Sequence, residues 1–119
     1  DPTDERLRRW GPFLSAHPAL SAGANVQVAC ATGRHRCRAL IWERGVGRTS
    51  ASGTSACAVA VAAASRGMVD AGTVEVQMEG GDLEVVVGPD LQVVLRGPVE
   101  DACEGHLTSG LLERLQRSV

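Results

Sequence analysis

Residues 42–57, WERGVGRTSASGTSAC, combine a charged pair, glycines and small hydroxylated residues that lead into an apolar segment. The apolar segment predicts a helix over residues 53–66, whose first backbone NH groups have no acceptor inside the helix. Together with the helix dipole, the amides of Gly53 and Thr54 would attract a carboxylate or a phosphate. Gly53 has no side chain and lets a ligand approach the backbone. The pattern therefore predicts an anion site at the start of this helix.

Glu43 and Arg44 come at the end of the strand predicted before this helix. A guanidinium group can bind a carboxylate through two parallel hydrogen bonds, and a carboxylate can bind an ammonium group. A site that holds both charges would bind an amino acid. Ser52 stands immediately before the helix. It is either a nucleophile, an ordinary helix cap or a replacement for a more reactive group.

The same residues also have ordinary structural interpretations. Serine and threonine commonly cap helices, so Ser52 and Thr54 fit that role without any chemistry. Neighbouring charges at a strand end, such as Glu43 and Arg44, are usually solvated. Asn25 precedes a predicted strand, where asparagine is typical of a turn. The residue types alone leave both interpretations open.

Common catalytic and metal-binding motifs do not fit the chain. A serine-hydrolase elbow requires G-x-S-x-G, and Ser50 stands where its first glycine should be. A Walker A loop requires a lysine, and the sequence contains none. The four cysteines form no C-x-x-C pair, and the histidines do not lie at zinc-like intervals from them. We therefore expect no metal and no cofactor, and reduced thiols as in a cytoplasmic protein.

The elements before the site are predicted from hydrophobic periodicity and from residues that start or end helices and strands. Residues 2–15 predict a short helix with Thr3 or Asp4 as its cap, broken at Gly11–Pro12. Residues 26–32 and 37–42 alternate like the two strands of a hairpin.

The site helix and the elements after it complete the pattern. The helix over residues 53–66 has almost no charge, ends at Gly67 and is expected to be buried on all sides. Strands are predicted over residues 73–78, 82–88 and 91–97, joined by turns. A last strand or coil follows, and then a short amphipathic helix to the C-terminus with Ser109 as a candidate cap.

These elements predict an α+β fold, with a mostly antiparallel sheet curved around one central buried helix. A length of 119 residues suits a single domain spanning 1–119. The net charge of -2 provides no basic surface for nucleic acid, and no segment approaches the ~20 apolar residues that span a membrane. We expect neither nucleic acid nor a membrane as a partner.

The motif ERGVGRTSASGTSACAVA resembles the C-terminal signature of the diaminopimelate epimerase family, ERG-x-G-x-T-x-A-C-G-T-G-A. HPALSAGANVQVA is similar to that family's HP-x-FP-x-G-x-NV loop and strand. GGDLEVVV and VVLRGPVEDACEGHL are similar to its closing strands. The resemblance runs in order through nearly the whole chain.

The resemblance implies a fold of two pseudo-symmetric halves, each with a sheet around a central helix, and an active site in the cleft between them. It implies a cofactor-independent two-base proton transfer that interconverts LL- and meso-diaminopimelate, in the cytoplasm, for lysine and peptidoglycan precursors. Carried over to this chain, it places Glu43 at the substrate as a catalytic residue. Asn25 and Arg44 would bind the distal end of the substrate, and Gly53 and Thr54 would supply amides.

The chain departs from the family pattern in two ways. Ser52 occupies the position of the catalytic cysteine, and a serine hydroxyl remains protonated where a thiol ionises. The family's N-terminal half and the first strands of this half are not in the sequence. We expect this chain to be impaired or inactive alone. We also expect it to require a partner, either the missing half or a second copy of itself.

Two function classes follow. The first is the C-terminal half of a diaminopimelate epimerase, or of a related racemase or isomerase with another substrate. The second is an amino-acid-binding remnant without catalysis, which kept the anion site and lost the thiol. The presence or absence of a first-half cysteine in the sequence encoded upstream would distinguish the two.

Overall fold

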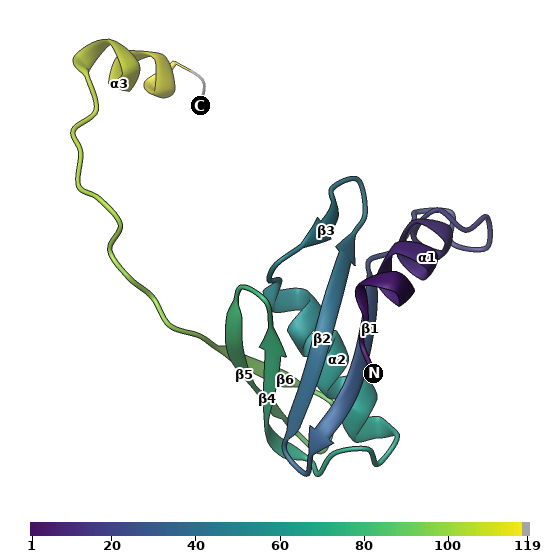
Figure 1. Ribbon diagram of the computed structural model, residues 1–119. Helices are drawn as coiled ribbons and strands as arrows, with labels where there is room; N and C mark the ends of the chain where they lie inside the picture. Colours follow the sequence, from purple (N-terminus) through teal and green to yellow (C-terminus); the bar gives the residue numbers. More distant parts are fainter. Residues whose placement is uncertain (118–119) are drawn as a thin grey trace.

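The computed structural model describes residues 1–117, which form three helices and six strands (Figure 1). In chain order they are α1 (Asp4–Ser15), β1 (Val26–Gly33), β2 (Arg36–Glu43), β3 (Gly47–Thr49), α2 (Gly53–Ser65), β4 (Gly72–Met78), β5 (Gly81–Val87), β6 (Val93–Arg96) and α3 (Ser109–Gln116).

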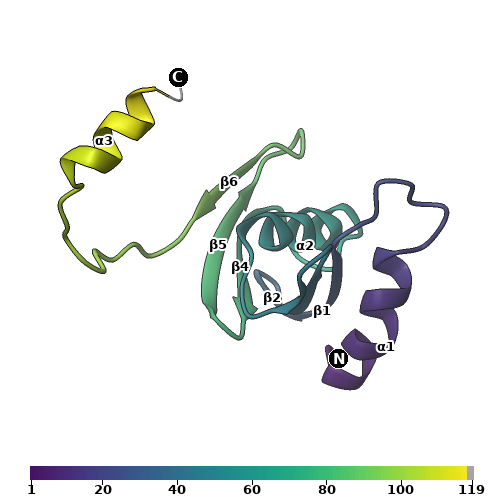
Figure 2. The ribbon, with the colours of Figure 1, turned by 90° about the horizontal axis from the view of Figure 1, so that it is seen from above.

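The strands form one open sheet in the order β1-β2-β4-β5-β6, with β3 paired to β2. All pairings are antiparallel except β2 with β4, which run parallel where Arg36 lies opposite Glu75. The sheet curves beneath α2, as the view from above shows (Figure 2). The predicted α+β class with a mostly antiparallel curved sheet is confirmed.

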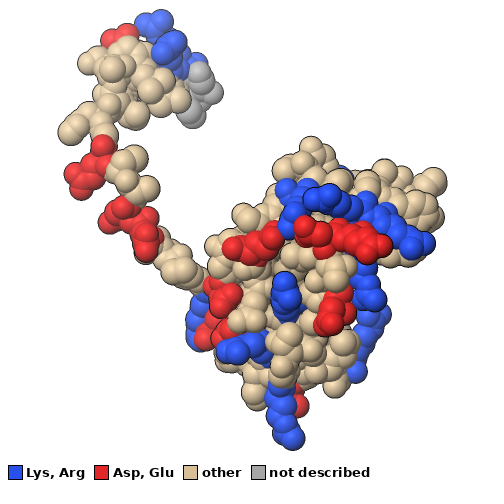
Figure 3. All heavy atoms as spheres, viewed as in Figure 1, with Lys and Arg blue, Asp and Glu red and all other residues tan. Residues whose placement is uncertain are grey.

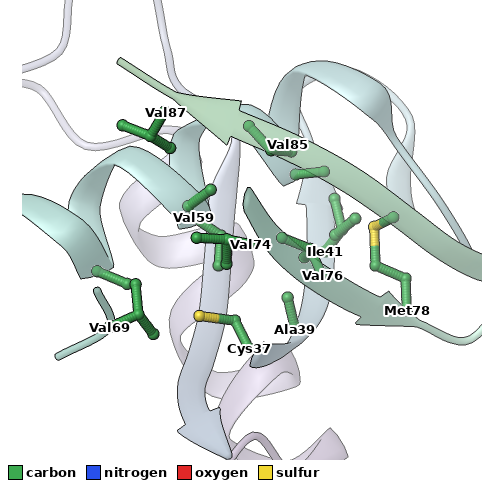
Figure 4. Close-up of a cluster of buried hydrophobic side chains, with 13 residues drawn as sticks. Cys37, Ala39, Ile41, Val59, Val69, Val74, Val76, Met78, Val85 and Val87 are labelled. Carbon is green, nitrogen blue, oxygen red and sulfur yellow. The ribbon is translucent and has the colours of Figure 1, made fainter. Parts of the chain in front are cut away.

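The core lies between α2 and the concave face of the sheet. Alternate residues of β2 point toward α2, and Cys37, Ala39 and Ile41 meet Val59 of the helix there (Figure 4). The small residues of α2 allow the strands to approach closely, so Ala60 is completely buried. Burial of these apolar side chains is the main source of stability in this part of the molecule.

The open sheet buries only one side of α2. Residues that face the strands are buried, whereas Ala58 and Ala62 on the outer side are exposed and Cys57 is half-buried. The expectation of burial on all sides is therefore not met, because nothing in residues 1–117 covers the outer side of the helix.

The first helix packs on the opposite side of β1 and β2. Its buried positions are Leu7, Gly11 and Ser15, which recur every four residues. A methyl group added at Gly11 would lie 2.8 Å from ring atoms of Trp42, so glycine permits close packing of helix and strand. The predicted break at Pro12 is wrong. The helix continues through Pro12, because Leu7, Gly11 and Ser15 are buried together only if they lie on one continuous helix face.

Thr3 is the cap of α1, and its Oγ1 accepts a hydrogen bond from the Arg6 amide at 3.3 Å. It is one of the two residues predicted for this position. Other boundaries differ from the predictions. The short strand β3 was not expected, because Gly45 and Gly47 in and before it are typical of a loop. The last strand of the sheet begins at Val93 and not at residue 91, since Leu91 adopts φ 63° in the preceding turn.

The C-terminal region extends away from the sheet (Figure 1). Residues 97–107 are coil, and the N-cap position of α3 is Thr108 and not Ser109, without a capping hydrogen bond from the Thr108 side chain. The end of the predicted C-terminal helix, residues 118–119, lies outside the described residues. None of the helices in residues 1–117 has the length and apolar character needed to cross a bilayer. On the face that Figure 3 shows, basic and acidic side chains are interspersed.

Candidate functional site

The site centres on the N-terminus of α2. Ser52 occupies the N-cap position with extended backbone angles, φ −158° and ψ 123°, but its side chain makes no capping hydrogen bond. Its Oγ lies 3.4 Å from Oγ1 of Thr54. The interpretation of Ser52 as an ordinary side-chain cap is therefore wrong, although its position in the chain is that of a cap.

The first backbone amides of α2 have no side-chain cap. The Ala56 amide donates to the Ser52 carbonyl at 3.0 Å, which opens the helical ladder. The amides of Gly53, Thr54 and Ser55 precede that bond, and Ser52 leaves them without a side-chain acceptor. Amides in this position attract an anion, and the helix dipole adds to the effect.

Glu43 faces the same end of α2. The Gln27 side chain donates to Oγ of Ser55 at 2.9 Å, and Gln27 lies opposite Ile41 in the β1–β2 register. Glu43 is two residues beyond Ile41, so it lies on the same face of β2, about 7 Å farther along the strand. This places Glu43 on the face of β2 that carries α2, at the level of the start of the helix. The meeting of the Glu43 carboxylate with the helix entrance stays a prediction.

Asn25 and Arg44 are also brought together. Oδ1 of Asn25 accepts a hydrogen bond from the Arg44 amide at 2.9 Å, which leaves the Asn25 NH₂ group free to donate. The Arg44 guanidinium donates to the carbonyl of Ala22. A methyl group at Gly23, where φ is +69°, would lie 2.6 Å from Cδ of Arg44. The loop before β1 therefore holds the Arg44 side chain in place.

Glu43 and Arg44 do not form an ion pair with each other. Within residues 1–117 neither side chain takes part in an ion pair, so both charges remain available. In the part of the chain that the structure describes, the Arg44 guanidinium donates to the Ala22 carbonyl and not to a group of α2. The structure thus forms two parts of the predicted site, one at the helix and one at the loop.

Two residues at the site were missed by sequence reasoning. Oγ1 of Thr49 is buried and is without a hydrogen-bond partner in the described part of the chain. Thr49 lies opposite Ile41 in the β2–β3 pairing and so shares the face that points to α2. Leu95 of β6 also borders the site, because a methyl group at Gly53 would lie 2.7 Å from its Cδ2. Neither residue carries a signal in the sequence, since β3 and the path of β6 set their positions.

The cysteines do not reach this entrance. All four are free thiols: Cys30, Cys37, Cys57 and Cys103. Burial raises the pKa of the Cys37 thiol, and the nearby Cys30 adds to the rise. Among the described residues, no group of histidine, cysteine and carboxylate side chains is arranged to hold a metal ion. The charged and polar groups of the site are those suited to an amino acid, with amides for its carboxylate and Glu43 for its amine.

Comparison with known proteins identifies relatives of this chain. A family model described as diaminopimelate epimerase matches residues 1–101. The diaminopimelate epimerase of Methylorubrum populi is 40% identical over 115 residues, which cover 97% of this chain and 38% of that protein. That of Chelativorans is 40% identical over 116 residues, covering 96% of this chain and 39% of the relative. That of Pseudomonas fluorescens is 40% identical over 102 residues, covering 85% and 37%. The chain thus spans about 38% of the first of these relatives.

Proposed function

Because this chain belongs to the diaminopimelate epimerase family, we propose that it forms one half of an amino-acid epimerase site whose substrate is diaminopimelate. The observation that carries the proposal is the uncapped N-terminus of α2, with Glu43 on the same side. The site acts without a cofactor, in the cytoplasm, in the synthesis of lysine and peptidoglycan precursors.

The proposed chemistry moves one proton to and one proton from the α-carbon. A base removes the α-proton, and the electron pair of the broken C–H bond delocalises into the α-carboxylate. The amides of Gly53 and Thr54 stabilise that negative charge because they point at the carboxylate and need no reorganisation. An acid on the opposite face then delivers a proton to the α-carbon. Residue 52 serves one face, and the other face requires a group from outside this chain.

Serine at position 52 limits this reaction. A thiol has a pKa near ~8.5, which a helix N-terminus lowers further, whereas a serine hydroxyl needs a second base to accept a proton. Glu43 is the carboxylate on the same side and is the candidate for that base or for binding the substrate amine. We expect binding to be retained and proton transfer at this face to be slow.

We further propose that the chain, a single domain over residues 1–119, works as the C-terminal half of an assembled protein. The chain spans about 38% of its Methylorubrum populi relative, so the rest of such an assembly would lie outside these residues. Exposed apolar residues support a partner, namely the outer side of α2 at Ala58 and Ala62 and the edge strand β6. The partner is the complementary half or a second copy of this chain. Light scattering that shows a stable monomer unable to bind either would contradict this part.

A second function, amino-acid binding without catalysis, is favoured by Ser52 itself. The two functions predict different responses to Ser52→Cys. The measurement is exchange of the α-proton of diaminopimelate with deuterated solvent, catalysed by the chain assembled with the first half of a family relative. For an epimerase half, Ser52→Cys raises the exchange rate by about 100-fold or more, as expected for an acid–base group restored at its position.

The matched control is Ser65→Cys, which puts a thiol at the opposite end of α2 and should leave the exchange rate unchanged. Titration calorimetry with diaminopimelate provides the second readout. Binding by both variants, with exchange unaffected by Ser52→Cys, would favour the binding function. No binding by the chain or its assembly would refute the proposed site.

A further inference from the structure

Residues 48–51 comprise the last two residues of β3 and the next two toward α2, and we call them the entry segment. The turn between β4 and β5 is attached directly to this segment. The Gly80 amide donates to the Ser50 carbonyl at 2.8 Å, two residues before Ser52. The placement of residue 52 therefore depends on a turn that is distant from it in the sequence.

Gly80 allows this attachment because it has no side chain. A methyl group at Gly80 would lie 3.0 Å from Cβ of Ala51, 3.1 Å from Oγ of Ser50 and 3.2 Å from the Ser50 carbonyl carbon. Since two of these neighbours belong to or adjoin the backbone, they could yield only if the entry segment shifted. Gly81 differs, because φ is +133° there and a methyl group would meet nothing within 4 Å.

Arg48 makes the second attachment. Its Nη2 lies 2.8 Å from Oδ1 of Asp4 in α1 and 2.7 Å from Oε1 of Glu79 in the β4–β5 turn. Its Nη1 also donates to Oδ2 of Asp4 at 3.2 Å. Partly exposed ion pairs add little stability. Here one guanidinium joins three elements, so its effect is on where they lie.

The Arg48 charge does not face the candidate site. Arg48 lies opposite Trp42 in the β2–β3 pairing, on the side of the sheet that carries α1. Thr49, the next residue, faces α2. Any influence of Arg48 on the site therefore passes through the backbone of the entry segment.

We propose that Gly80 and Arg48 are positioning residues, which hold the entry segment so that the side chain of residue 52 lies at the free amides of α2. The inference rests on the proposed function only for the catalytic role of residue 52. The geometric effect can be measured in this chain by itself.

The position of residue 52 matters because the electrostatic effect of a helix N-terminus has a short range. Its effect on a charge is confined to the first turn, so a shift of about 1 Å in residue 52 changes how strongly the amides stabilise an anion there. Among the described residues, the nearby charged side chains are Glu43 at the end of β2 and Arg44 directly after it, and the neighbour from β6 is Leu95. Neither Gly80→Ala nor a change at Glu79 alters those groups directly.

The test uses Ser52→Cys as the parent, so that a thiol reports on the site. Alkylation by iodoacetamide is followed against pH, and peptide mass spectrometry reads position 52 and Cys57 separately. Cys57 lies in the same helix, five residues farther on, and serves as the internal reference. In the parent, the helix N-terminus lowers the thiol pKa at position 52, so that this position reacts faster than Cys57 near pH 7.

Gly80→Ala in this background should slow alkylation at position 52 about threefold or more at pH 7 and shift its profile to higher pH. Gly33→Ala is the matched control, since a methyl group there meets only Cβ of Arg36 at 3.8 Å. Glu79→Gln should cause a smaller change in the same direction. Its control is Glu75→Gln, which removes the ion pair with Arg36 at 2.9 Å, away from the entry segment.

An unchanged profile at position 52 in folded Gly80→Ala would overturn the proposal. So would an equal change at Cys57, because that would mean general loosening of α2. If Gly80→Ala fails to fold by circular dichroism, Glu79→Gln against Glu75→Gln decides in the same way. An ordinary thiol profile in the parent would count against the proposed amino-acid site, while the difference between Gly80→Ala and Gly33→Ala still decides the positioning role.

Discussion

The two ends of α2 differ in how their backbone groups are capped. At the C-terminus, the Met68 amide donates to the Ala63 carbonyl and the Gly67 amide to the Ala64 carbonyl, both at 2.9 Å. Gly67 adopts φ 64°, which completes a Schellman motif. At the N-terminus, Ser52 stands in the cap position and its side chain caps nothing.

The difference is not one of composition, because small and hydroxylated residues occur at both ends. Ser65 at the C-terminal end uses its hydroxyl to donate to the Val61 carbonyl at 2.7 Å. Ser52 has no such bond to the backbone. A helix start without a side-chain cap leaves backbone amides that a group outside the chain can accept from, and the proposed substrate carboxylate would be such a group.

A permanent cap at the N-terminus of α2, which we call the open end, should have the largest effect on ligand binding. The C-terminus of α2 is called the closed end. Ser52→Asp would place a permanent carboxylate at the free amides, and we expect diaminopimelate to bind at least about tenfold more weakly, since charge-assisted hydrogen bonds are lost to the ligand. The same change should stabilise the fold by about 1 kcal/mol, as an acidic N-cap does. Titration calorimetry and urea unfolding measure the two effects.

The control is Ser65→Asp, the same substitution at the other end of the helix. A negative charge at the C-terminus opposes the helix dipole, so the fold should lose stability and ligand binding should not change. Equal losses of binding in both variants would mean that the two ends do not differ in function.

The closed end was predictable from the sequence, and the open end only in part. Gly67 after a small-residue helix is a local signal, and the structure confirms it as the residue that ends α2. The anion site was inferred because the free amides belong to any helix start. That Ser52 would not cap them was not inferable, since serine in that position usually does.

Long-range pairing explains what the sequence did not reveal. Thr49 and Leu95 reach the site through β3 and β6, whose positions depend on partners elsewhere in the sheet. The continuous α1 overrides Pro12 because packing against β1 and β2 outweighs a local preference. The Ser52 position itself was recognised through a family motif and not through any physical pattern.

Breaking the closed end should cost stability without affecting the site. Gly67→Ala forces a side chain into the left-handed region, which costs about 1 kcal/mol. Urea unfolding should show this loss, while Gly33→Ala, which keeps ordinary backbone angles and has room for a methyl group, should be close to neutral. Weakened diaminopimelate binding in Gly67→Ala would contradict the independence of the two ends.

The smallest effect concerns a thiol in the core. Cys37 is buried against α2, and burial raises the pKa of its thiol, with a further contribution from Cys30. A raised pKa in the folded state favours the neutral thiol, so this contribution to stability is present at neutral pH and is lost as the pH rises above about 9. Cys37→Val should make unfolding less sensitive to alkaline pH, whereas Cys103→Ser, at an exposed position, should not.

An identical pH dependence in the unsubstituted chain and in both variants would show that Cys37 does not couple folding to alkaline pH. The pKa of the thiol introduced by Ser52→Cys should shift in the opposite direction. The free amides of α2 stabilise the thiolate at position 52, whereas the apolar core destabilises the thiolate of Cys37.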